Sequence, residues 1–234
     1  MTEGGAPIGA WRRATVRSVA HPNPHAVTLR LDVPDRIDHV PGQHYVIRLT
    51  ADDGYVAQRS YSVASPPSDP QLEFYVERLE DGEVSTFLAD VVEVGDELEI
   101  RGPIGGWFVW TADHPALGIA GGSGAVPFVA MVRHARDVGR SDLLRLAVSA
   151  RTRADLPYAD ELISAGALVT LTRETYLERP AARVTRDELA ALTSAEATCF
   201  VCGSAGFAEA ATDLLMAAGV AAQRVRVERF GPSG

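Results

Sequence analysis

The pattern of apolar residues changes half-way along the chain, and this change limits the possible folds most strongly. The first half has short runs rich in Val, Tyr, Leu and Thr, separated by turn signals such as Pro41-Gly42 and Asp53-Gly54. Such runs are typical of antiparallel strands in a small barrel. The second half alternates strand-like and helix-like segments, which predicts a parallel sheet with helices on both faces. We therefore predict two domains: a six-stranded antiparallel β-barrel in residues 1–111 and an α/β nucleotide-binding domain in residues 112–234.

One predicted strand of the first half has a clear half-buried pattern. In this strand Leu72, Phe74 and Val76 alternate with Glu73 and Glu77, as in a half-buried strand. The strands predicted in this half are Arg12–Ala20, Ala26–Val33, His44–Leu49, Val56–Ala64, Gln71–Leu79 and Glu97–Arg101. Those predicted in the second half are Leu117–Ala120, Leu143–Ser149, Ala167–Leu171, Phe200–Cys202 and Val225–Val227.

Charge and composition exclude several classes of protein. The net charge is −9, so a general attraction to nucleic acid is not expected. All 22 basic residues are Arg, which excludes P-loop NTPases, protein kinases and pyridoxal enzymes because each requires a Lys. There is no apolar run of membrane-spanning length, and Met1–Gly5 does not begin a secretory signal. We expect a cytoplasmic monomer that binds neither membrane nor nucleic acid.

The two cysteines, Cys199 and Cys202, do not predict a metal or disulfide centre. An all-cysteine iron–sulfur cluster needs four ligands, and no His cluster supplies the others. We expect no metal site. The C-x-x-C spacing also occurs in redox motifs. Here it falls within a predicted strand, on which side chains three apart point to opposite faces, so a catalytic disulfide is not favoured.

The segment Arg59-Ser60-Tyr61-Ser62 is the first that suggests specific chemistry. It resembles the R-x-Y-S flavin motif of the ferredoxin–NADP reductase superfamily. The resemblance implies that Arg59 pairs with the FAD pyrophosphate and that the Tyr61 ring lies against the flavin. It also implies that Ser62 hydrogen-bonds near flavin N5. The alternative is an ordinary strand with a solvated Arg59 and a core Tyr61.

A second segment, 74–88, is similar to the family's other flavin element, a strand followed by a glycine turn and a short helix. Backbone N–H groups at the helix start would hold pyrophosphate oxygens, helped by the Ser85 hydroxyl. This second phosphate-binding element favours FAD over FMN. The alternative is a capped surface helix. The residues that the resemblance places at the cofactor are Tyr75, Val76, Glu77, Gly82, Val84 and Ser85.

Two turns in the first half also match the family. Pro41-Gly42-Gln43-His44 resembles the P-G-Q turn that opens a barrel strand, and Arg101–Gly105 resembles the G-P-x-G turn that closes the barrel. We expect both turns to be mainly structural.

A glycine-rich loop follows the first predicted strand of the second half. Its residues Gly122, Ser123 and Gly124 precede a helix, where a pyrophosphate can meet the helix N-terminus. Pro127 stands at the third glycine position of the G-x-G-x-x-G dehydrogenase fingerprint. The loop instead resembles the GG-[ST]-G-x-x-P loop of the same superfamily.

Two further motifs lie near the end of the chain. Cys202-Gly203 resembles the family's C-G-P segment, with Ser204 where Pro is commoner, and this implies that Cys202 lies beside the nicotinamide. Glu228 and Phe230 resemble the acidic and aromatic residues that end the family's chains near the flavin. The alternatives are a buried structural Cys and a frayed tail. The resemblance thus implies Ser62, Cys202, Glu228 and Phe230 as catalytic residues.

Arginines at two predicted strand ends favour NADPH over NADH. In the family, Arg residues at these ends bind the 2′-phosphate of NADPH, and here Arg151 and Thr172-Arg173 occupy them. An NADH site would instead tend to show an acid for the ribose. NADH stays possible, and each Arg can also be a solvated loop residue.

The resemblance implies an FAD-dependent oxidoreductase that takes hydride from NADPH. The electrons would then pass to a ferredoxin or to the iron–sulfur or haem centre of an oxygenase. Two alternatives stay open: a reductase of free flavin or a small acceptor, and an electron-transfer subunit that no longer binds nicotinamide. Arg12, Arg13 and Arg17 suggest a local basic dock for an acidic partner in a half whose balance is −8, from nine Arg and 17 acidic residues.

Overall fold

The computed structural model describes residues 9–230 of the chain. Met1–Gly5, on which the expectation about a secretory signal rests, and Gly231 lie outside the described residues. The chain divides into two compact units, Met1–Val109 and Trp110–Gly234, and each is described by itself. No helix within residues 9–230 is long and apolar enough to cross a membrane.

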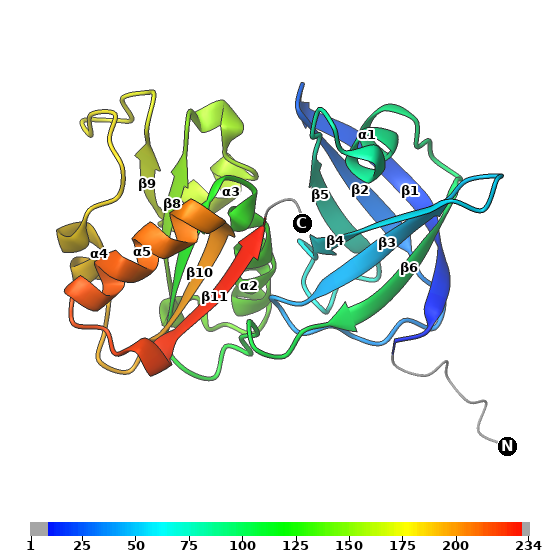
Figure 1. The fold of residues 1–234 in the computed structure, drawn as a ribbon. Helices are drawn as coiled ribbons and strands as arrows, with labels where there is room; N and C mark the ends of the chain where they lie inside the picture. Colours follow the sequence, from blue (N-terminus) through cyan, green and yellow to red (C-terminus); the bar gives the residue numbers. More distant parts are fainter. Residues whose placement is uncertain (1–8, 231–234) are drawn as a thin grey trace, which may run out of the picture. The chain divides into compact units, whose positions relative to one another are not determined.

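The first unit is a six-stranded antiparallel sheet in the order β4-β3-β6-β1-β2-β5 (Figure 1). Val63, directly after β4, forms an antiparallel bridge with Phe74 of β5, so the two outer strands meet and close the sheet as the predicted barrel requires. The elements of this unit are β1 (Trp11–Asn23), β2 (Ala26–Asp32), β3 (His44–Thr50), β4 (Val56–Ser62), β5 (Leu72–Glu77), α1 (Glu83–Asp90) and β6 (Glu97–Ile104).

Inward-facing apolar residues of this sheet form one core. Leu29, Ile47 and Phe74 are completely buried in it, and α1 adds Leu88. The predicted half-buried pattern of β5 is wrong at Glu73, which is 6 % exposed. Its carboxylate is buried because it pairs with Arg30 at 2.8 Å, so β5 is covered on both faces.

The second unit is a parallel five-stranded sheet in the order β11-β10-β7-β8-β9, as the alternating pattern predicts. The four short 3₁₀ segments, η1 (Gly122–Ala125), η2 (Ser141–Leu143), η3 (Arg153–Asp155) and η4 (Ala222–Arg224), lie between larger elements. Those elements are β7 (Ala116–Gly121), α2 (Val126–Asp137), β8 (Leu144–Ala150), α3 (Ala159–Ser164), β9 (Leu168–Leu171), α4 (Arg186–Leu192), β10 (Thr198–Ser204), α5 (Ala205–Ala217) and β11 (Val225–Phe230).

Helices cover both faces of this sheet. Leu117 of β7 packs in a cluster with Leu215 of α5. Gly118, the next residue, faces Phe128 of α2 so closely that a Cβ would lie 2.5 Å from the ring. Successive residues of a strand point to opposite faces, so α5 and α2 lie on opposite sides of the sheet (Figure 1).

The strand order identifies one point of the sheet at which a ligand site is expected. From β7 the chain runs outward through β8 and β9, then returns to the other side of β7 as β10 and β11. In open parallel sheets, ligands bind beyond the carboxyl ends of the strands where the order reverses. Here that point lies between β7 and β10, where Gly121–Gly124 and Cys202-Gly203 are found.

Candidate functional site

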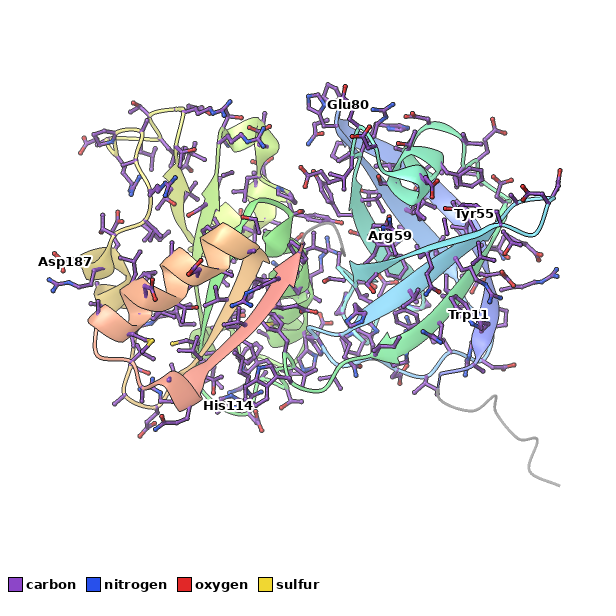
Figure 2. All side chains as sticks on the ribbon, in the orientation of Figure 1. Trp11, Tyr55, Arg59, Glu80, His114 and Asp187 are labelled. Atoms are coloured by element: carbon purple, nitrogen blue, oxygen red, sulfur yellow. The ribbon has the colours of Figure 1, made fainter. Side chains whose placement is uncertain are left out.

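Arg59 presents an uncommitted cation on the outer strand β4 (Figure 2). Its side chain is exposed, and its one hydrogen bond within residues 9–230 goes to the carbonyl oxygen of its neighbour Gln58, at 2.7 Å. Other barrel arginines are ion-paired: Arg17 to Asp32 at 2.9 Å and Arg48 to Glu99 at 2.9 Å. Arg59 is therefore free to meet an anion.

Two hydroxyl groups next to Arg59 also have unused hydrogen-bonding capacity. Tyr61 packs its ring against the barrel core, and burial raises the pKa of its hydroxyl well above the ordinary value. Neither the Tyr61 nor the Ser62 hydroxyl has a hydrogen-bond partner among the described residues, and Ser60 is exposed. Partly buried polar groups usually find partners, so this segment has the donors and acceptors that a bound ligand would satisfy.

The turn before α1 uses the Ser85 hydroxyl internally. That oxygen accepts a hydrogen bond from Leu79 N at 3.2 Å and donates to the Gly82 carbonyl at 3.1 Å. A Cβ on Gly82 would overlap Ser85, which explains the glycine. A phosphate here would therefore be held by backbone N–H groups of the first turn, which includes buried Val84, rather than by the Ser85 hydroxyl.

Strand β5 presents few side-chain groups to a cofactor. Val76 is completely buried, and the Tyr75 hydroxyl accepts a hydrogen bond from Asn23 at 3.2 Å. Glu77 is exposed. One edge of β5 pairs with β2. At its other edge, Phe74 forms a β-bridge with Val63, and Tyr75 and Val76 form none among the described residues. Contacts from Tyr75 and Val76 to a cofactor would therefore come from their backbone.

Two turns that appeared separate in the sequence are joined. The Gln43 side-chain amide donates to the Gly105 carbonyl at 2.6 Å, and its oxygen accepts from Val40 N at 2.7 Å. The P-G-Q and G-P-x-G segments therefore form one structure beside the first residue of β3, His44. Sequence reasoning did not single out His44 as a site residue, although a His beside a turn glutamine was the available signal.

The glycines at the switch point have different reasons for being glycine. Gly122 has a left-handed φ of +56° and nothing within 4 Å of its Cβ position. At Gly124 a Cβ would lie 2.6 Å from the carbonyl carbon of Cys202, so this glycine is required by packing. A Cβ on Gly203 would lie 2.6 Å from the Phe207 ring. The loop and Cys202 are thus in direct contact.

The helix after the glycine loop has an N-terminus suited to an anion. The first turns of η1 and α2 contain no acidic side chain, and the Ser123 hydroxyl has no partner among residues 9–230. By contrast, α3 begins with Asp160-Glu161, and α4 begins with Asp187-Glu188. The positive end of the helix dipole is therefore uncompensated where the nucleotide would lie.

Arg151 and Arg173 lie side by side at the ends of two adjacent parallel strands. Arg173 N donates to the Arg151 carbonyl at 2.8 Å, and Thr172 precedes Arg173 directly. Both arginines are exposed, and neither guanidinium has a partner within the described part of the chain. The nearby Arg153 is instead ion-paired with Asp160. Two exposed cations without partners among the described residues thus follow the ends of β8 and β9.

Cys202 and Glu228 are opposite each other on β10 and β11. Cys202 is completely buried, and burial, followed by the Glu228 carboxylate, raises the pKa of its thiol well above the ordinary value. Burial raises the pKa of Glu228 to about 7. The Cys202 thiol therefore stays protonated and is no nucleophile. Burial also raises the pKa of the free Cys199 thiol, and the same conclusion holds for it. Phe230 is the last described residue and ends β11.

The sequence predicts a basic docking surface formed by Arg12, Arg13 and Arg17, but each of these arginines has a partner of its own. Arg13 pairs with Glu97 at 3.0 Å and Arg17 pairs with Asp32 at 2.9 Å. Arg12 donates to the Asp35 carbonyl, and as the neighbour of Arg13 on a strand it points to the opposite face. These side chains stabilise local contacts instead of forming one basic surface.

Comparisons with known proteins agree with these features. Residues 15–109 match the family described as oxidoreductase FAD-binding domain. Over 168 residues the chain is 34 % identical to the propane 2-monooxygenase reductase component of Mycolicibacterium goodii, with 70 % of this chain and 47 % of the relative covered. It is 28 % identical to the ferredoxin–NAD(P)(+) reductase component of naphthalene 1,2-dioxygenase/salicylate 5-hydroxylase systems from Ralstonia sp, with 95 % and 70 % covered.

The fold is also found in a solved structure. A ferredoxin NADP⁺ reductase from Neisseria gonorrhoeae with bound FAD and NADP superposes with a TM-score of 0.82 at 18 % identity, covering 94 % of this chain and 98 % of that one. The chain spans about half the length of the first curated relatives, 47 % for the propane monooxygenase component. The chain matches an oxidoreductase FAD-binding domain, is related to the reductase components of oxygenases and has the fold of a ferredoxin NADP⁺ reductase.

Proposed function

We propose that this protein takes hydride from NADPH onto FAD and passes the electrons singly to a ferredoxin or to an oxygenase component. The observation that carries the proposal is the group of uncommitted side chains on β4, Arg59, Tyr61 and Ser62, within the segment that matches an FAD-binding domain. The Tyr61 and Ser62 hydroxyls have no hydrogen-bond partner among the described residues, so both are available to a bound cofactor.

These residues fit FAD well. The Arg59 guanidinium would pair with the pyrophosphate, together with backbone N–H groups at the start of α1. The Tyr61 ring would support the flavin, and the Ser62 hydroxyl would bond to its polar edge. The flavin supplies hydride and electron chemistry once bound, while the protein binds, orients and shields it.

The nucleotide unit supplies two anion sites of different kinds. Backbone groups at the start of η1 and α2, with the Ser123 hydroxyl, suit the pyrophosphate of the dinucleotide. Arg151 and Arg173 suit the 2′-phosphate that distinguishes NADPH from NADH. The resemblance would place the nicotinamide beside Cys202, whose thiol is neutral and completely buried.

The proposal of a protein partner rests on the relatives. Several of them are reductase or electron-transfer components of oxygenase systems. The reduced cofactor can release electrons one at a time, which lets a two-electron donor serve a one-electron acceptor.

Flavin analysis and an acceptor screen test the proposal. We expect the purified protein to release stoichiometric FAD, rather than FMN, on denaturation. With NADPH it should reduce a ferredoxin or an isolated oxygenase component faster than free flavin at equal concentration. Release of FMN would contradict the FAD assignment, and preference for free flavin would instead indicate a flavin reductase.

A further inference from the structure

The turn between β3 and β4 holds the backbone of Tyr55 in place directly before β4. Gly54 N donates to the Ala51 carbonyl at 2.9 Å, and Ala51 N donates to the Tyr55 carbonyl at 2.9 Å. Tyr55 N donates to the Asp53 carboxylate at 2.9 Å. Gly54 has a left-handed φ of +86°, which favours glycine. Tyr55 is therefore fixed by the turn on both sides of its peptide unit, although it is 57 % exposed.

The Tyr55 side chain joins this turn to α1. Its hydroxyl donates to the Glu83 carboxylate at 2.9 Å. This hydrogen bond, followed by the charge of Glu83, raises the pKa of Tyr55, and the Arg59 cation opposes that shift. Burial raises the pKa of Tyr61, and Arg59 opposes that shift as well. The Arg59 guanidinium therefore lies near both hydroxyls, in the unit where Tyr55 connects to α1 (Figure 2).

Glu83 lies at the end of α1 where a pyrophosphate would bind. It is the acidic residue in the first turn of this helix. The first hydrogen bond of α1 is donated by Thr86 N to the Gly82 carbonyl at 2.8 Å, so the N–H groups of residues 83–85 have no partner within the helix. The helix dipole attracts a carboxylate and a phosphate alike at this end. Glu83 would thus compete with a pyrophosphate for the same positive groups.

The Glu83 carboxylate is nevertheless kept apart from Arg59. Its one hydrogen bond within residues 9–230 is the one from Tyr55, and no ion pair joins it to Arg59 in that part of the chain. The Arg59 side chain bonds only to the Gln58 carbonyl there. Both side chains are exposed and both lie near the Tyr55 hydroxyl. The Tyr55 hydroxyl is therefore the group that directs Glu83 away from a nearby cation.

We propose that Tyr55 is a positioning residue for FAD, whose hydroxyl holds the Glu83 carboxylate away from Arg59 and from the free N–H groups of α1, so that both stay open to the pyrophosphate. This proposal rests on the proposed function, since it concerns the same FAD site. Tyr55 acts through Glu83 and needs no contact with the cofactor. Without the hydroxyl, Glu83 is free to pair with Arg59 and to repel the pyrophosphate.

Dissociation constants for FAD, measured by flavin fluorescence quenching on the FAD-free protein, test this role. Tyr55→Phe should raise the constant about fivefold, the change expected when one exposed ion pair competes with the ligand. Glu83→Gln alone should not weaken binding, and the double variant should bind as tightly as Glu83→Gln. This rescue would not occur if Tyr55 contacted FAD or only stabilised the turn. An unchanged constant in Tyr55→Phe, or a double variant as weak as Tyr55→Phe, would overturn the proposal.

Glu80→Gln is the matched control for charge. Glu80 is an exposed acid shortly before α1 and has no partner among the described residues. Its replacement removes the same charge, yet the double variant of Tyr55→Phe and Glu80→Gln should stay weak. Rescue as complete as that by Glu83→Gln would show a general effect of charge and would contradict the proposal.

A second measurement needs no FAD. In an ultraviolet titration of the FAD-free protein, Glu83→Gln should move the ionisation of one tyrosine to lower pH, and Tyr55→Phe should remove that tyrosine from the titration. No shift in Glu83→Gln would show that the hydrogen bond is absent in solution and would overturn the proposal. Failure of the natural protein to bind FAD would contradict the proposed function instead.

Discussion

The two units of this protein prepare for phosphate groups in different ways. For its pyrophosphate the flavin unit would add a side chain, Arg59, on a strand at the outside of its sheet, to the backbone N–H groups of α1. For its pyrophosphate the nucleotide unit would rely mainly on backbone, in a glycine loop packed against the end of β10, and would use the Arg151 and Arg173 side chains for the 2′-phosphate alone. A side chain can be removed without disturbing the fold, whereas a packed loop cannot be enlarged without displacing a strand. The units should therefore respond differently to substitution.

The largest effect should follow Gly124→Ala in the nucleotide unit. The new methyl group would lie 2.6 Å from the Cys202 carbonyl carbon, so the loop or β10 must move. Overpacking against backbone should lower the free energy of unfolding by about 3 kcal/mol. Thermal unfolding measures it. The control is Gly206→Ala on α5, where nothing lies within 4 Å; an equal loss there would show that packing is not the cause.

The two units also differ in how they hold a buried acidic residue, and this difference predicts how stability depends on pH. Glu73 in the flavin unit is paired with Arg30, whereas burial raises the pKa of Glu228 in the nucleotide unit to about 7. As pH rises from the ordinary Glu value toward 7, the unfolded chain loses its proton before the folded chain does. Glu228 should therefore destabilise the folded state by up to about 3 kcal/mol above pH 7.

Glu228→Gln is expected to remove this pH dependence. The variant should unfold at a higher temperature than the natural protein at pH 8, and at nearly the same temperature at pH 4. Glu209→Gln, on the exposed part of α5, should change neither value. A Glu228→Gln variant that is less stable at pH 8 would show that the ionised carboxylate is held by favourable contacts.

Arg59→Ala should weaken FAD binding without unfolding the barrel. Loss of a charge-assisted contact to phosphate costs about 2 kcal/mol, or roughly 30-fold in the dissociation constant. Flavin fluorescence quenching on the FAD-free protein measures it. Arg17→Ala removes an ion-paired barrel arginine instead and should leave FAD binding unchanged. Equal affinities for the natural protein and Arg59→Ala would remove Arg59 from the site.

The smallest effect should come from the exposed pair Arg151 and Arg173. Solvent screens these cations, so each change to Ala should raise the KM for NADPH by about tenfold, near 1.5 kcal/mol. The KM for NADH should hardly change. Arg153→Ala, which removes an ion-paired arginine close by, is the control. Equal effects on both donors would contradict a 2′-phosphate site.

Local patterns predicted the architecture well because period and turn signals follow directly from backbone geometry. The parallel sheet and its helices on both faces were predicted, and every predicted strand has a counterpart. Helices α3 and α4 were missed, although Thr185 and Glu188 form a capping box that marks the start of α4. Helix α4 has only one buried residue, Leu189, so its apolar residues do not repeat at helical spacing.

The roles of particular side chains were harder to predict, because they depend on contacts between distant segments. Gly124 and Gly203 matched cofactor motifs, yet their close neighbours are the Cys202 carbonyl and the Phe207 ring. The Ser85 hydroxyl is committed to its own turn. Conversely, the place of His44 opposite Ser62 follows from strand register, which sequence alone leaves undetermined.

Anaerobic stopped-flow reduction tests the central claim most directly. The FAD-loaded protein is mixed with NADPH or NADH, and the oxidised flavin absorbance is followed. We predict rapid bleaching with NADPH and slower bleaching with NADH at equal concentration, because only NADPH carries the phosphate that Arg151 and Arg173 would bind. Protein that binds FAD but is bleached by neither donor would contradict the account.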